Sequence, residues 1–288
     1  MKNILTSSIL ALATMTIPTR AAQATVAVSN NDLVLSFQTP NTPGNTINLE
    51  VDLGPADFYY NPTGAATLGT ATPVTITNIG HLSVADLSSP TSFGSGWASR
   101  TDLTWGIAGS SANDGSNDAI YGINTDYLTR PETAAQVRTS PWNRVSNNNA
   151  STTAITSMYA TLNGAASTAN STDSSLISKA NANSYTSRQT QDLGLTFRLL
   201  NGNSVNDMPV ASFVGPYISI EDLYALQPGA SGTPGDYLGS FGLRSDGTID
   251  YLQIPLAAVP EPATIGFGLA MLGACAMGRF RTRRQVVA

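Results

Sequence analysis

The sequence has few groups that commonly perform catalysis or bind metal. Its 288 residues include one cysteine, Cys275, and one histidine, His81. This excludes a small disulfide-stabilised fold and a zinc site built from a cysteine–histidine cluster. In a serine–histidine mechanism His81 would have to be the base, yet no G-x-S-x-G turn accompanies it. We interpret His81 as structural, and we predict no catalytic residue and no enzymatic activity.

Charged residues are also scarce, at 11% of the chain against about 25% in ordinary soluble domains. Ser, Thr, Asn, Gly and Ala replace them. The net charge is −5, but residues 25–258 alone hold 8 basic and 18 acidic residues, a balance of −10. This acidic body argues against a nucleic-acid partner, which needs a basic surface. Long apolar runs are few, which excludes a multi-span membrane protein.

Residues 1–24 have the pattern of a secretory signal peptide. Lys2 supplies the positive start, residues 4–17 form a short apolar core, and Ala22 and Ala24 form an A-x-A cleavage site. Thr and Ser interrupt the apolar core, and the alternative is a buried amphipathic helix. We predict export of a mature chain that begins after Ala24.

Residues 259–288 combine three elements in a fixed order. A Pro-Glu-Pro motif comes first, the apolar segment 263–278 follows, and basic residues close the tail. The motif and the basic residues are Val259, Pro260, Glu261 and Pro262, then Arg279, Arg281, Arg283 and Arg284. The apolar segment would rise about 24 Å as a helix, slightly less than a ~30 Å hydrocarbon core. We predict one transmembrane helix with its arginines in the cytoplasm, which places the acidic body outside.

This tail resembles the PEP-CTERM sorting signal of bacterial exported proteins. The resemblance covers about the last 30 residues and implies that an exosortase, a membrane protease, recognises the motif and removes the tail. It also implies a Gram-negative host that makes exopolysaccharide, a transient stay in the inner membrane, and release to the cell surface or a biofilm matrix. The alternative is an ordinary C-terminal anchor in which Pro-Glu-Pro is coincidental.

Residues 25–258 alternate apolar and polar residues, as strands do when one face meets a core and the other meets water. The clearest runs are residues 33–37, 47–53, 103–107 and 193–199. Two further runs flank Asp246 and Gly247, which predict a hairpin turn. We predict a mainly β domain over residues 25–258, an antiparallel sandwich or jelly roll with a small helical insert.

Two segments break the alternation. Residues 83–100 predict a short helix and a loop. Residues 145–187 hold only two charges, and four apolar residues there fall at helical spacing: Ile155, Met158, Tyr159 and Leu162. A second helix is predicted around Leu176, Ile177 and Ala180. We expect an inserted helical pair, and the alternative is a flexible low-complexity insert.

The loop 113–118 is the best candidate for an ion site. Asp114, Ser116 and Asp118 are spaced like alternate ligands of a calcium loop. Thr125 stands where an EF-hand places its last acidic ligand, and a plain Asx/Gly turn is the alternative. We predict no required cofactor, with calcium as the one ion that this loop could bind.

Acid pairs and aromatic rings suggest two further functions. A glycoside hydrolase needs two carboxylates about 5–10 Å apart. The candidate pairs are Glu50 with Asp52, which we interpret as a solvated strand face, and Glu221 with Asp222. A carbohydrate-binding module needs exposed rings, and the loop candidates are Tyr59, Tyr60, Trp97 and Trp142. These rings could equally fill a β core.

The tail is the only specific motif in the chain, and it concerns destination. The main hypothesis is therefore an exported, exosortase-processed surface or matrix protein, structural and associated with exopolysaccharide. The alternatives are a lectin-like module and a secreted glycoside hydrolase.

Overall fold

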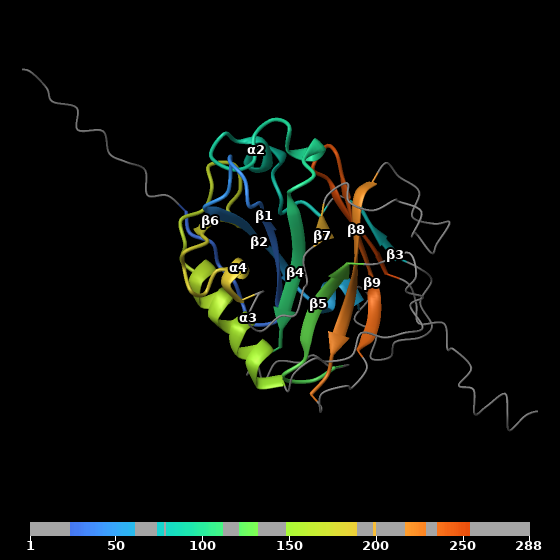
Figure 1. Ribbon diagram of the computed structural model, residues 1–288. Coiled ribbons are helices and arrows are strands. Elements are labelled where there is room, and N and C mark those ends of the chain that lie inside the picture. The colour runs from blue at the N-terminus through green and yellow to red at the C-terminus, as the bar shows by residue number, and fades with distance from the viewer. Residues whose placement is uncertain are drawn as a thin grey trace, which may run out of the picture.

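The computed structural model describes residues 24–60, 74–77, 79–111, 121–131, 148–188, 198–199, 217–228 and 235–253 (Figure 1). The strands in this part of the chain are β1 Asp32–Gln38, β2 Ile47–Pro55, β3 Val74–Ile76, β4 Thr104–Ser110, β5 Asp126–Pro131, β6 Ser174–Ser178, β7 Arg198–Leu199, β8 Tyr217–Leu226, β9 Asp236–Arg244 and β10 Ile249–Gln253. The helices are α1 Asp57–Tyr60, α2 Val84–Ser88, α3 Asn148–Leu162, α4 Tyr185–Arg188 and the 3-10 helix η1 Trp97–Ser99.

All of these strands belong to one antiparallel sheet. Its order is β3-β10-β9-β8-β5-β4-β1-β2-β6, and the short β7 pairs with β4. The predicted class, mainly antiparallel β, is confirmed. The predicted sandwich-like arrangement is present, but one continuous curled sheet forms it in place of two separate sheets.

The contacts of Tyr59 show how strongly the sheet curls. Its hydroxyl donates to the carbonyl oxygen of Leu53 in β2 at 2.7 Å, and its ring centroid lies 5.2 Å from that of Tyr251 in β10. β2 and β10 are six positions apart in the strand order, and a flat sheet would separate them by about 29 Å. Curling closes one face around a single core, which includes Leu33, Leu35, Phe37, Leu49, Val51, Leu53, Leu103, Trp105 and Ile107. The predicted inner faces of the first three alternating runs are therefore confirmed.

The opposite face of β1, β2 and β4 is buried too, and this overturns the prediction that it meets water. α3 lies across this face (Figure 1), and its apolar side packs against Val34 and Ala108. The helix contributes Ala154, Ile155, Met158, Tyr159 and Leu162. Glu50 is fully buried on the same face beside α4. Alternation in the sequence predicts which face of a strand is polar. It does not predict that this face is buried, because the helix that covers it lies about a hundred residues away in the chain.

The segment 148–188 contains the long helix α3, the strand β6 and the four-residue helix α4 instead of the predicted helical pair. α3 confirms the first predicted helix, and Gly164, with φ +80°, lies just beyond its end in the left-handed region that favours glycine. The second prediction is wrong, because Leu176 and Ile177 lie in β6, which pairs with β2. Two adjacent apolar residues between serines fit either structure. Hydrogen bonding to β2 decides for a strand.

Two local predictions are confirmed. Residues 83–100 form α2, a loop and η1. β9 and β10 form the predicted hairpin, with Leu243 opposite Ile249. Gly247 lies in its turn at φ +85°, where a residue with a side chain would be strained.

Several predicted features lie outside the described residues. They are most of the signal peptide, the loop with Asp114, Ser116 and Asp118, Trp142, most of the run 193–199, and the tail from Val259 onward. Across the described ranges, no helix combines the length and the apolar character needed to cross a membrane.

Candidate functional site

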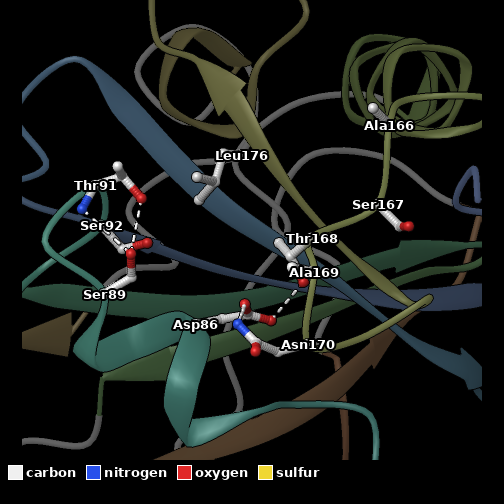
Figure 2. A pocket seen from close by; sticks show the side chains of 10 residues that line it. All are labelled: Asp86, Ser89, Thr91, Ser92, Ala166, Ser167, Thr168, Ala169, Asn170 and Leu176. Atoms are coloured by element: carbon white, nitrogen blue, oxygen red, sulfur yellow. Dashed lines mark hydrogen bonds between the residues drawn. The ribbon is translucent and has the colours of Figure 1, made fainter. Parts of the chain in front are cut away.

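A pocket of about 300 Å³ lies between α2 with its following loop and the segment 166–176 (Figure 2). Hydroxyl and amide side chains dominate its lining, and Leu176 adds an apolar side chain that is 36% exposed. The lining residues are Asp86, Ser89, Thr91, Ser92, Ala166, Ser167, Thr168, Ala169, Asn170 and Leu176.

Asp86 joins the two walls of this pocket. Its side chain is buried, and its two carboxylate oxygens accept hydrogen bonds from three side chains of the opposite wall. Thr168 Oγ1 and Ser174 Oγ donate to Oδ2 at 2.7 and 2.8 Å, and Asn170 Nδ2 donates to Oδ1 at 2.7 Å. Figure 2 shows Asp86 reaching from α2 toward Thr168 and Asn170. The carboxylate therefore holds a loop in place.

Within the pocket, Asp86 serves as a structural acceptor. Asp86 is the only charged residue in the pocket lining, and both of its oxygens already accept hydrogen bonds within the protein. The hydroxyl and amide groups of the walls can donate hydrogen bonds to a small polar ligand and accept hydrogen bonds from it.

Replacing Asp86 with Ala is expected to loosen the segment 166–173 and to destabilise the protein by roughly 2–3 kcal/mol. The reason is that a buried carboxylate is removed, so that Ser174, which is buried, Thr168, which is half-buried, and Asn170 lose a charged acceptor at once. Hydrogen exchange should show faster deuterium uptake in that segment, and urea unfolding should show the loss. Thr91→Ala is the control, because exposed Thr91 lines the same pocket without contacting Asp86. Equal exchange in the two variants would contradict the anchoring role.

His81 reinforces the same connection. Its Nδ1 lies 2.7 Å from Asp173 Oδ2, and its backbone oxygen accepts a hydrogen bond from Ser171 Oγ at 2.9 Å. Both side chains of the His81–Asp173 pair are about 40% exposed. These contacts support a structural role for His81.

The predicted acid pairs do not form a hydrolase site. Glu50 Oε1 accepts hydrogen bonds from the Tyr185 backbone N–H at 2.9 Å and from Asn48 Nδ2 at 3.3 Å, beneath α4. Burial raises its pKa from 4.5 to about 7. The predicted solvated face is therefore wrong for Glu50, whose carboxyl is sealed from any substrate.

The second acid pair is divided by the sheet. Glu221 and Asp222 are neighbours in β8, so their side chains point to opposite faces. Asp222 accepts a hydrogen bond from Ser240 Oγ at 2.5 Å, and both carboxyls are buried. They do not converge on one reacting bond. Among the described residues, no group of three or more His, Cys, Asp and Glu side chains is arranged to hold a metal ion.

Three of the four aromatic candidates fill the core. Tyr59, Tyr60 and Trp97 are at most 3% exposed, and Tyr60 packs on Tyr121 and Tyr127. Their rings are therefore not platforms for a sugar, and the prediction of exposed loop aromatics is wrong for these three residues. Trp142 lies outside the described residues.

Asp86 and its partners are the site residues that the sequence pattern missed. Asp86 appeared only as part of a short helix, and Thr168, Asn170 and Ser174 only as part of a polar segment. The partners are separated by more than eighty residues, so no local spacing links them.

The C-terminal tail is the one part of the chain with a match among known proteins. Residues 258–285 match the PEP-CTERM protein-sorting motif. The match includes the Pro-Glu-Pro residues, the apolar segment and Arg279 to Arg284, and it confirms the predicted resemblance. The motif implies export, transit as a membrane-anchored chain, and processing by an exosortase, which is a membrane enzyme. No curated protein and no solved structure matches the chain.

Proposed function

We propose that the protein is a non-catalytic surface protein of a Gram-negative bacterium. Its tail holds it in the inner membrane until an exosortase cuts near the Pro-Glu-Pro motif. The folded body then remains on the cell surface or in the extracellular matrix, associated with exopolysaccharide. The PEP-CTERM motif at residues 258–285 carries this proposal.

Features of the body support the proposal. Residues 25–258 contain no cysteine, which avoids wrong disulfides in an oxidising envelope. The one charged group in the described pocket serves as a structural acceptor. Serine, threonine and asparagine side chains like those of the pocket can exchange hydrogen bonds with the hydroxyls of a polysaccharide.

The double variant Pro260→Ala/Pro262→Ala is expected to stop processing. It replaces the two ring-constrained residues that flank Glu261, and so removes the fixed backbone of the motif. Mass spectrometry should find that most of the chain retains Arg279 to Arg284 and stays in the membrane fraction. Surface protein from the parent strain should lack those residues.

Pro255→Ala is the matched control, because it removes a proline just before the matched region 258–285. It should be processed like the wild type. Processing of the double variant at the wild-type level would refute the role of the motif, and equal failure of both variants would indicate a nonspecific effect on the linker.

A further inference from the structure

The described residues end in β10, and this fixes the end of the sheet from which the tail leaves. Gln253 is the last residue of β10 and lies opposite Gly239, near the start of β9. Since neighbouring strands are antiparallel, β10, β8 and β4 finish at this end while β9, β5 and β1 begin there (Figure 1). We refer to it as the tail end of the sheet.

Two exposed apolar side chains lie at the tail end. Phe58, in α1, is 49% exposed, and Ile123, in the turn before β5, is 57% exposed. The segments that carry them are in contact, because the rings of Tyr60 and Tyr121 are 5.2 Å apart. α1 also packs against β10, the last described strand before the tail, since the ring of Tyr59 contacts that of Tyr251.

The opposite end of the sheet has a different character. The β9–β10 turn lies there, and Gly247 of that turn is packed against Val84 of α2. α2 also forms one wall of the polar pocket. The length of β10, about 17 Å for five residues, separates this end of the sheet from Gln253. Val84 is 45% exposed, so it matches Phe58 in exposure but not in position.

The link between sheet and tail is short. Ala263 begins the apolar segment ten residues after Gln253, so an extended chain spans at most about 36 Å between them. A domain of the size of residues 25–258 is about 45 Å across. While the tail is in the bilayer, the tail end is therefore the part of the domain tethered closest to lipid.

We infer that the tail end of the sheet rests on the membrane before processing, with Phe58 and Ile123 in contact with the lipid interface. This inference rests on the proposed function, because it requires the tail to anchor the chain. Amphipathic contact with a bilayer uses apolar side chains of this kind. Asp57 and Asp236 lie at the same end, so the surface suits zwitterionic lipid better than anionic lipid or a second acidic copy.

The test uses the full chain in phosphatidylcholine vesicles. Three variants are made in a Cys275→Ser background, each with one new cysteine: Phe58→Cys, Ile123→Cys and Val84→Cys. The new cysteine is labelled with a polarity-sensitive fluorophore. Probes at positions 58 and 123 should shift their emission to the blue when vesicles are added, and the probe at 84 should not. Hydrogen exchange on the unsubstituted chain should show slower deuterium uptake at residues 56–60 and 121–125, which removes any dependence on how the variants fold.

The outcomes separate the two proposals. If the chain floats with the vesicles but all three probes respond alike, the tail does anchor the chain and the proposed lipid contact is wrong. A chain that does not float overturns both. Blue shifts at 58 and 123 that appear without vesicles and grow with protein concentration would assign the surface to a second copy and overturn the lipid contact.

Discussion

The ionisation of Glu50 inside the protein is expected to lower the free energy of unfolding by about 3 kcal/mol as the pH rises from about 4.5 to 8. Burial raises the pKa of its carboxyl from 4.5 to about 7, and Oε2 has no hydrogen-bond partner in the described structure. In the unfolded chain the same carboxyl ionises at its ordinary pKa. The stability contributed by neutral Glu50 is therefore complete below pH 4.5 and is lost up to about pH 7.

Two other carboxyls, those of Asp32 and Asp52, also lower the free energy of unfolding as the pH rises. Burial raises the pKa of Asp32 from 3.8 to about 6, and burial also raises the pKa of Asp52. Asp102 acts with the opposite sign, since its hydrogen bonds with Arg100 hold its pKa well below 3.8. The stability that ionised Asp102 contributes is present above pH 3.8 and is lost only in stronger acid. We expect maximum stability between about pH 4 and 5.

Urea unfolding followed by tryptophan fluorescence at several pH values tests this expectation. Glu50→Gln keeps the shape and the acceptor for Tyr185 N–H but cannot ionise, so most of the slope between pH 5 and 8 should disappear. A smaller slope from Asp32 should remain. Asp102→Asn is the control, because it should lower stability by a similar amount at each pH in this range. A wild-type slope in Glu50→Gln would contradict the assignment.

Replacing Trp105 with Ala is expected to destabilise the protein by about 3–5 kcal/mol, because it opens a large cavity inside the curl of the sheet. Trp105 is fully buried in β4, and its ring stacks on Phe37 of β1 at 6.2 Å between centroids. Its Nε1 donates to Ser219 Oγ of β8 at 2.7 Å, so the substitution also removes the partner of a buried hydroxyl.

Phe58→Ala is the matched control, since it also removes an aromatic ring, but one that is half exposed. Its expected effect is within about 0.5 kcal/mol. Thermal or urea unfolding compares the two variants. Similar losses in both would mean that Trp105 is not a central contact of the core.

Some elements were predictable because their cause is local. The hairpin follows from Asp246 and Gly247, and α3 follows from four apolar residues at helical spacing. β6 was not predictable, because Leu176 and Ile177 alone fit a helix or a strand and pairing with β2 decides between them. The burial of Glu50 had no local signal, since α4 covers it from 135 residues away.

The same distinction between local and distant causes applies to the two candidate functional regions, the sorting tail and the pocket. The tail was readable from sequence because a sorting signal is recognised as a short linear segment with its residues in order. The pocket was not, because Asp86 meets Thr168 and Asn170 only after the two walls fold together.

The sequence alone determined where this protein is sent and that its body is mainly antiparallel β. It also determined the scarcity of catalytic groups, since one histidine and one cysteine are properties of composition. Only the tertiary structure decided that the strands form one curled sheet with both faces of β1 and β2 covered, and that the tyrosines belong to the core. The physical reason is that burial depends on partners distant in the chain, whereas a linear motif and strand alternation depend on neighbours.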